Sequence, residues 1–273
     1  MANHPELHYM IDWAYTPEKL KTLLDKGSNP NEGYWKYDEN ALHVAVRRRR
    51  LDCIDVLLAH GVPIDAKTKG GKTAYAHAIR RGFTEIADHL AALGADTGLN
   101  TADQWAVLLR ENKLAEAKAM LAKSPNIARE MNAEEARILP DLAGRPLPEA
   151  VSLLLDAGTD ITSRGLDEGT ALHMSAWFGQ LAITHLLIER KAPLEIRGDL
   201  HNMSPLGWVV HGSVYSSSAE SHAEDYAAIA KALLEAGALL THPDHPEDLH
   251  GAWLLKKVGP AVEQVLRAYG AKN

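Results

Sequence analysis

One mark recurs along the whole chain: a leucine-rich helix end followed by a glycine or by a residue in its place. It reads LLDKG at residues 23–27, LLAHG at 57–61 and LLDAG at 154–158. In order, the marks fall at Gly27, Gly61, Gly94, Ser124, Gly158, Lys191, Gly237 and Gly270. Their successive spacings are 34, 33, 30, 34, 33, 46 and 33 residues. A period in this range is typical of stacked repeats, in which each copy buries its apolar face against its neighbours.

The residues around each mark predict a pair of helices. A glycine just past a helix end can take the left-handed conformation that closes the last turn. Upstream, a short helix begins after a residue that can cap its free amides, as at Asn40, Thr73, Thr170 and Ser204. A turn then leads to a second helix with apolar residues at i, i+3, i+4 and i+7. The pattern therefore favours thin helices packed in a row.

These copies closely resemble the ankyrin repeat, with its T-P-L-H start, A-x-x-G turn and L-L-x-x-G-A-D end. Residues 38–66, 71–97, 169–196 and 204–240 match this pattern. The resemblance implies an all-α fold with short β-hairpin fingers, an ankyrin-repeat solenoid of about eight repeats including two degenerate caps. It also implies that His43 and His173, at the starts of first helices, hydrogen-bond between neighbouring repeats.

We expect residues 1–273 to form a single ankyrin-repeat domain. Its expected parts are an N-terminal capping repeat at 10–33, two regular repeats at 34–97, two degenerate repeats at 98–161, two repeats at 162–240 and a C-terminal capping repeat at 241–273. The 46-residue interval is 13 residues longer than 33, and we place the excess as a surface insertion at 213–225. Pro140, Pro146 and Pro148 predict a shorter first helix in the second degenerate copy, and residues 101–104 resemble a capping box.

Composition limits the classes of function. The formal net charge is −7, and residues 141–273 carry all of it, with 10 basic and 17 acidic side chains. General nucleic-acid binding needs a net basic surface, so we expect no nucleic-acid partner. The single cysteine, Cys53, excludes an intramolecular disulfide framework. With no apolar run near ~18 residues and no signal-peptide pattern, we expect a cytoplasmic protein without a membrane partner.

Basic residues recur at the ends of the first helices in two adjacent repeats. Arg47 and Arg48 stand where Arg80 and Arg81 stand one repeat later, while Arg49 and Arg50 occupy a turn in which glycine is usual. A solvated helix face would also explain these charges. Because the feature recurs, we favour a basic patch on the concave surface, shared with the finger residues Lys69 and Lys72.

Large aromatic residues are the second candidate binding feature. Trp177 and Phe178 occupy positions that point into the groove, where they either meet a partner or are covered by the insertion with Tyr215. Both interpretations stay open. Tyr34, Trp35 and Tyr37 form a similar cluster at the first finger, and His211 should also face the groove, whereas we expect Trp208 to lie in the core.

No combination of residues points to catalysis. The chain lacks a glycine-rich phosphate loop, a G-x-S-x-G elbow and an H-E-x-x-H pair, and Cys53 lies among apolar residues. Three histidines and three carboxylates lie within residues 242–250, but the prolines there do not ensure that these ligands converge. We therefore predict no enzyme activity, no cofactor and no resident metal.

The sequence thus predicts a non-enzymatic module that binds a partner protein through the concave groove and fingers. The partner would offer acidic groups to the arginines and lysines and an apolar group to Trp177 and Phe178. An inhibitor, an immunity protein and a scaffold all fit this prediction. The alternative is a small-ligand or metal-responsive sensor that uses the 213–225 insertion or the 242–250 histidine segment.

Overall fold

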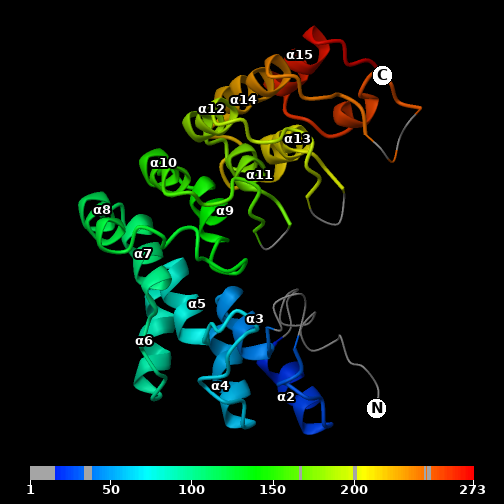
Figure 1. Ribbon diagram of the computed structural model, residues 1–273. Coiled ribbons are helices and arrows are strands. Elements are labelled where there is room, and N and C mark those ends of the chain that lie inside the picture. Colours follow the sequence, from blue (N-terminus) through cyan, green and yellow to red (C-terminus); the bar gives the residue numbers. More distant parts are fainter. Residues whose placement is uncertain (1–15, 34–38, 166–167, 199–201, 243, 245–246) are drawn as a thin grey trace. The chain divides into compact units, whose positions relative to one another are not determined.

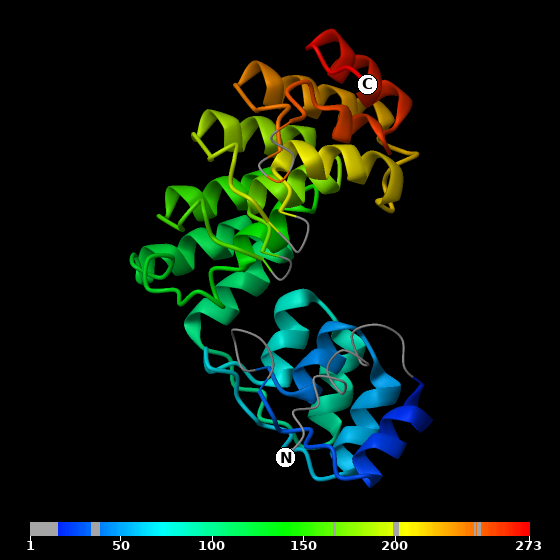
Figure 2. The same cartoon turned by 90° about the vertical axis from the view of Figure 1, so that its right-hand side faces the viewer.

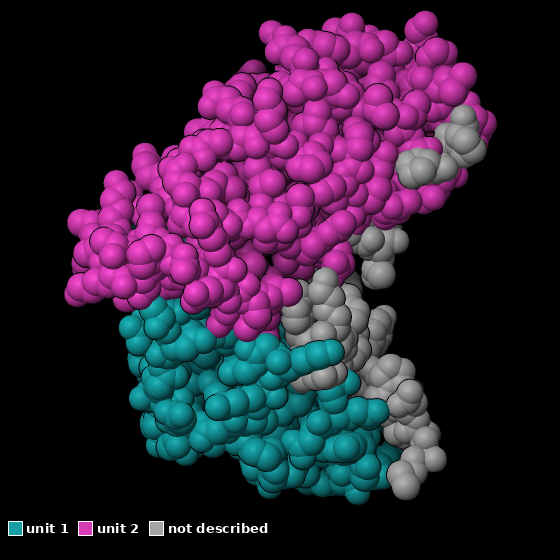
Figure 3. Space-filling view, viewed as in Figure 1, with its two compact units in different colours: residues 1–113 teal, residues 114–273 magenta. Residues whose placement is uncertain are grey.

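The computed structural model describes residues 16–33, 39–165, 168–198, 202–242, 244 and 247–273. The chain forms two compact units, Met1–Lys113 and Leu114–Asn273 (Figure 3). Their boundary falls inside the first degenerate copy, and the continuity of one domain over 1–273 stays a prediction. In the described residues, no helix is long and apolar enough to cross a membrane.

The first unit is a stack of short helices. Its described helices are α2 (Pro17–Asp25), α3 (Ala41–Arg47), α4 (Leu51–Ala59), α5 (Ala74–Arg81), α6 (Thr84–Ala92) and α7 (Thr101–Arg110). The first helices of successive repeats pack in one row, α3 on α5 and α5 on α7, while α2 packs on α4 (Figures 1 and 2). Each of these repeats therefore packs on the next one, as in a solenoid.

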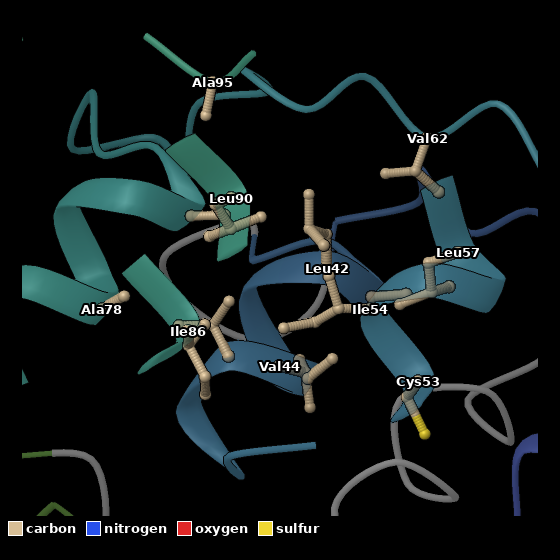
Figure 4. Close-up of a cluster of buried hydrophobic side chains, with 14 of the residues drawn as sticks. Leu42, Val44, Cys53, Ile54, Leu57, Val62, Ala78, Ile86, Leu90 and Ala95 are labelled. Atoms are coloured by element: carbon tan, nitrogen blue, oxygen red, sulfur yellow. The ribbon is translucent and has the colours of Figure 1, made fainter. Parts of the chain in front are cut away.

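The core of the first unit lies between the helices of adjacent repeats. Figure 4 shows Leu42 of α3 between Leu57 of α4 and Leu90 of α6, and all three side chains are fully buried. Alanines such as Ala45 and Ala78 let the helices approach closely. Burying one leucine side chain contributes about 1.5–3 kcal/mol to the free energy of unfolding. The unit is therefore stabilised by many small interfaces between repeats rather than by one large central core.

The second unit is also built of two rows of helices. Its helices are α8 (Leu114–Lys123), α9 (Ile138–Ala143), α10 (Pro148–Asp156), α11 (Ala171–Trp177), α12 (Leu181–Glu189), α13 (Pro205–Tyr215), α14 (Ala223–Glu235), the 3-10 helix η2 (Ala252–Leu255) and α15 (Pro260–Ala268). The first helices α9, α11 and α13 pack in sequence, and α10, α12, α14 and α15 form the second row (Figure 1). As the prolines predict, α9 is short, with six residues.

The described residues contain fourteen α-helices, which correspond to about seven repeats, close to the eight expected. Between the described residues no strand forms, and the fingers show one isolated antiparallel bridge, Gly198 with Met203. The fingers are therefore turns rather than regular hairpins in these ranges. The short connections leave too few residues for a ladder of backbone bonds.

The helix ends follow the glycine pattern. Gly61 and Gly237 have φ values of 79° and 103°, and a Cβ added to either would meet no atom within 4 Å. Glycine is therefore required there by the backbone conformation and not by space. At the helix starts, the Asn40 side chain accepts the amide protons of Leu42 and His43, as predicted. For α7 the cap is Asn100, one residue before the expected capping box.

The 213–225 segment differs from the expected surface insertion. Helix α13 has 11 residues where α11 has seven, and α14 has 13 where α12 has nine. Only residues 216–222 lie outside helices. Most of the added length therefore extends both helices of the pair, because the alanine-rich start of α14 favours helix over loop.

Two buried histidines each tie one repeat to the next. The Thr170 amide donates to Nδ1 of His173 (3.0 Å), which leaves the ring proton on Nε2, and this nitrogen donates to the carbonyl oxygen of Met203 (3.2 Å). His43 repeats the arrangement, bonded to the Asn40 amide and to the Lys72 carbonyl oxygen. The family resemblance had implied this role, and the geometry confirms it.

The His173 ring should stay neutral in weakly acidic solution. Burial lowers its pKa from 6.5 to about 4. Between pH 6.5 and 4 the histidine is protonated in the unfolded chain but not in the folded one. The contribution of this site to the free energy of unfolding is therefore present above pH 6.5 and is lost as the pH falls towards 4. We expect the His173 imidazole proton signals in an NMR titration to stay constant between pH 7.5 and 5.5. In a His173→Gln variant, the free energy of unfolding should depend less on pH over 4–6.5; an NMR midpoint near 6.5 would contradict the assignment.

Candidate functional site

Three residues of the expected basic patch are buried in ion pairs. The Arg47 side chain is only 5% exposed, and its Nε donates to Glu39 Oε2 at 3.1 Å. Lys72 Nζ lies 2.9 Å from both oxygens of Asp103, and Arg80 Nε lies 3.3 Å from the same carboxylate. This corrects the expectation that Arg47, Lys72 and Arg80 belong to an exposed surface.

The buried carboxylates were missed in the sequence because each lies in a different segment from its cation. Asp103 lies at the third position of α7, 31 residues after Lys72, and its side chain is 4% exposed. The acidic partner of Lys72 therefore lies about one repeat period after it in the sequence. A search for acids about one period from each base would have found the Lys72–Asp103 pair.

The exposed cations gather at the turns between paired helices. Arg48 and Arg49 are exposed after α3, and Arg81, at the end of α5, is half-buried with Nη1 near the His77 carbonyl oxygen (3.5 Å). The guanidinium carbon of Arg49 lies 5.2 Å from the centroid of the Phe83 ring, which joins the two turns. We call Arg48, Arg49, Arg81 and Phe83 the turn cluster.

Arg49 occupies a backbone conformation that favours glycine. Its φ is 55°, and Gly82 and Gly179 stand at the equivalent turns with φ values of 74° and 67°. A side chain in the left-handed region costs about 1–2 kcal/mol relative to the right-handed one. Arg50, by contrast, forms a close ion pair with Asp52. Lys69, in the finger that precedes α5, is also exposed.

Trp177 and Phe178 are half-buried within the second unit. The Trp177 ring packs edge-on against Trp208, with centroids 5.8 Å apart, and Trp208 is 6% exposed, as expected for a core residue. Phe178 lies over Gly144, where an added Cβ would come within 2.8 Å of the ring. Both residues are partly exposed, so each could still contact a partner, although neither is fully exposed.

The lengthened helix α13 carries the other aromatic candidates of this unit. The rings of His211 and Tyr215 pack edge-on with centroids 5.9 Å apart, and Tyr215 is 52% exposed. Tyr34, Trp35 and Tyr37 lie outside the described residues. The first finger therefore adds nothing to the site that the structure describes.

The described part of 242–250 serves local structure. The His242 ring is buried against Trp253, with centroids 4.9 Å apart, and its Nδ1 accepts the Asp244 amide proton. Asp248 accepts amide protons from His250, Ala252 and Trp253. In the residues described there, no three ligand atoms come close enough to hold a metal ion.

The buried thiol is unsuited to nucleophilic chemistry. Cys53 is fully buried in α4, and burial raises the pKa of its thiol to about 11. A reactive cysteine needs a pKa near or below the ambient pH. Cys53 therefore acts as a small apolar residue of the core beside Leu42 and Leu57.

Comparison with known proteins agrees with the helix pairs and their period. A family model described as ankyrin repeats, in three copies, matches residues 7–101. The same helix pair, glycine mark and interrepeat histidine continue beyond that range, at His173 and Gly237. The chain contains ankyrin repeats. Such repeats are typically protein-protein interaction modules and are generally non-catalytic.

Individual ankyrin proteins resemble the chain only in part or at low identity. It is 35% identical over 89 residues to the nuclear factor NF-kappa-B p105 subunit of Gallus gallus, a match that covers 32% of this chain and 9% of that protein. The crystal structure of the human ASB11 ankyrin repeat domain is 19% identical with a TM-score of 0.41, covering 98% of this chain and 99% of that one. The chain spans under a tenth of the curated relative, and neither likeness indicates a specific function here.

The Asp103 carboxylate should be essential for the stability of the first unit. Changing Asp103→Asn removes the carboxylate that both buried cations, Lys72 and Arg80, contact, and breaking a buried ion pair typically costs about 3–5 kcal/mol. Urea unfolding followed by circular dichroism should show an early transition. Asp55→Asn is the matched control, because Asp55 is 58% exposed and pairs with His89 at the surface. Equal midpoints for both variants would contradict the assignment.

Proposed function

We propose that this chain is a non-enzymatic module that binds a partner protein, with the turn cluster as a docking surface for acidic groups. The strained Arg49 carries the proposal. Its guanidinium is exposed and held over Phe83, at a turn where glycine would be free of strain. Residues kept in strained conformations by their surroundings are concentrated at functional sites.

The charge of the surface supports an acidic partner. Arg48, Arg49, Arg81 and the finger residue Lys69 are exposed or half-buried in the first unit, whereas Arg47, Lys72 and Arg80 neutralise buried carboxylates. Arginine beside an aromatic ring binds carboxylates through a planar fork of donors. In the second unit, Trp177, Phe178, His211 and Tyr215 offer the apolar contacts that we propose for the same class of partner.

An inhibitor, an immunity protein or a scaffold would each use such a surface, and we propose a cytoplasmic location for it. The single, buried cysteine supports a reducing compartment. The alternative, a ligand or metal sensor that uses 213–225 or 242–250, gains no support from the described residues of those two segments. Residues 213–215 and 223–225 belong to helices α13 and α14, and His242 and Asp248 bond to backbone amides.

An affinity pull-down tests the proposed function. We would compare the full chain with Arg48→Glu/Arg49→Glu/Arg81→Glu, and with a control of equal net charge, Lys26→Glu/Lys118→Glu/Lys123→Glu, whose three lysines are exposed elsewhere. A protein retained by the wild type and the control, and lost by the cluster variant at equal helicity, is the expected result. If all three baits retain the same proteins, the turn cluster is not the docking surface.

Arg49→Gly gives a sharper test with the captured partner. Relief of the left-handed strain should offset the lost cation–π contact, so the free energy of unfolding should stay within about 0.5 kcal/mol. Partner affinity, measured by isothermal titration calorimetry, should fall about ten-fold. A variant that loses stability but keeps its affinity would show that Arg49 is a structural residue.

A further inference from the structure

The lengthened α13 is a rigid extension of the repeat. The Tyr226 hydroxyl, at the start of α14, donates to the Trp177 carbonyl oxygen at 2.6 Å, and Ser218 Oγ donates to the Phe178 carbonyl oxygen at 3.2 Å. At the other side, the Gly259 amide donates to Ser213 Oγ at 3.0 Å. These bonds tie the added turns to the preceding repeat and to the segment before α15. Side chains on the tip of α13 are therefore presented in a fixed position.

The end of α13 exposes apolar side chains on one face. His211, Val214 and Tyr215 are spaced i, i+3 and i+4 and so lie side by side on the helix surface. Val214 is 41% and Tyr215 52% exposed. Among the large exposed apolar residues of the described chain, these two alone are neighbours in sequence; the others are Leu93, Leu239, Leu249 and Tyr269. A rigid helix end that leaves adjacent apolar residues uncovered is typical of a binding surface.

Two lysines give this surface a local positive charge. Lys257 Nζ lies 5.9 Å from the centroid of the Tyr215 ring, and Lys256 beside it is exposed. The bond from Gly259 to Ser213 keeps this segment next to α13. Residues 141–273 as a whole carry an excess of acidic groups, 17 against 10 basic ones, and Lys256 and Lys257 are two of the ten. The tip of α13 is thus positively charged within a half of the chain whose net charge is negative.

We propose that His211, Val214, Tyr215, Lys256 and Lys257, the α13 tip, bind a peptide segment of a partner protein that carries an apolar side chain flanked by carboxylates. The apolar side chain would cover Val214 and Tyr215, and the carboxylates would pair with the lysines. This inference rests on the proposed protein-binding function but uses a surface separate from the turn cluster. It adds a contact at the helix tip to the apolar contacts proposed for the half-buried Trp177 and Phe178.

Panning a random 12-residue peptide display library on the full chain tests the proposal. Enriched peptides should combine acidic with aromatic or aliphatic residues. Their dissociation constants, measured by fluorescence anisotropy, should rise at least ten-fold for Tyr215→Ser and for Lys257→Glu. Tyr269→Ser is the matched control, because Tyr269 is 40% exposed on α15 and its hydroxyl bonds Glu235. The Lys257→Glu variant keeps the test decisive if Tyr215→Ser unfolds.

Each other outcome counts against the α13 tip. No enrichment, basic or neutral peptides, or unchanged binding by both tip variants would overturn it, as would self-association of the wild type that Tyr215→Ser abolishes. The turn-cluster triple variant is measured with the same peptides and should bind them normally. If the turn-cluster variant no longer retains the partner protein but still binds the peptides, the two surfaces act independently. Either proposal can therefore fail without the other.

Discussion

Two buried imidazoles, His43 and His173, each join one repeat to the next, and the stacking of those repeats depends on them. The His43 and His173 rings accept an amide proton from their own helix start and donate to a carbonyl oxygen 29 or 30 residues further on. One neutral ring thereby satisfies a helix cap and fixes the register of the next repeat. A protonated ring could not accept the amide proton. Burial also favours the neutral ring, so the hydrogen bond and the burial both require an uncharged imidazole.

The outer helices add a second, weaker ladder at the same period. His60 pairs with Asp25, His89 with Asp55 and Arg190 with Asp156, at separations of 35, 34 and 34 residues. These side chains are partly exposed, and such pairs contribute little each. The inner contacts therefore set the geometry, while the outer ion pairs favour correct neighbours. For His60, bonds to the Val56 carbonyl and to Asp25 raise the pKa, opposite to the effect of burial on His173.

The sequence was sufficient for features that depend on neighbouring residues and on the period. The glycine marks, the Asn40 cap and the role of His43 follow from local stereochemistry and from the family pattern. It was insufficient for side chains whose direction depends on a residue one repeat away. Lys72 resembles the exposed Lys69 in the sequence, yet the carboxylate of Asp103 draws only Lys72 inward. Neither the local sequence nor the repeat period identifies the partner, because the repeat pattern encodes the stacking of helices and not the ligand.

Departures from the repeat are therefore the most informative positions for function. Stacking alone would be served by glycine in place of Arg49, and by a pair of seven- and nine-residue helices in place of α13 and α14. Both departures carry a cost, in backbone strain or in exposed apolar surface, and both are held in place by specific contacts. Features that burden folding and yet are braced by neighbouring side chains point to recognition rather than to stability. We therefore propose that the chain binds its partner where its repeats are least regular.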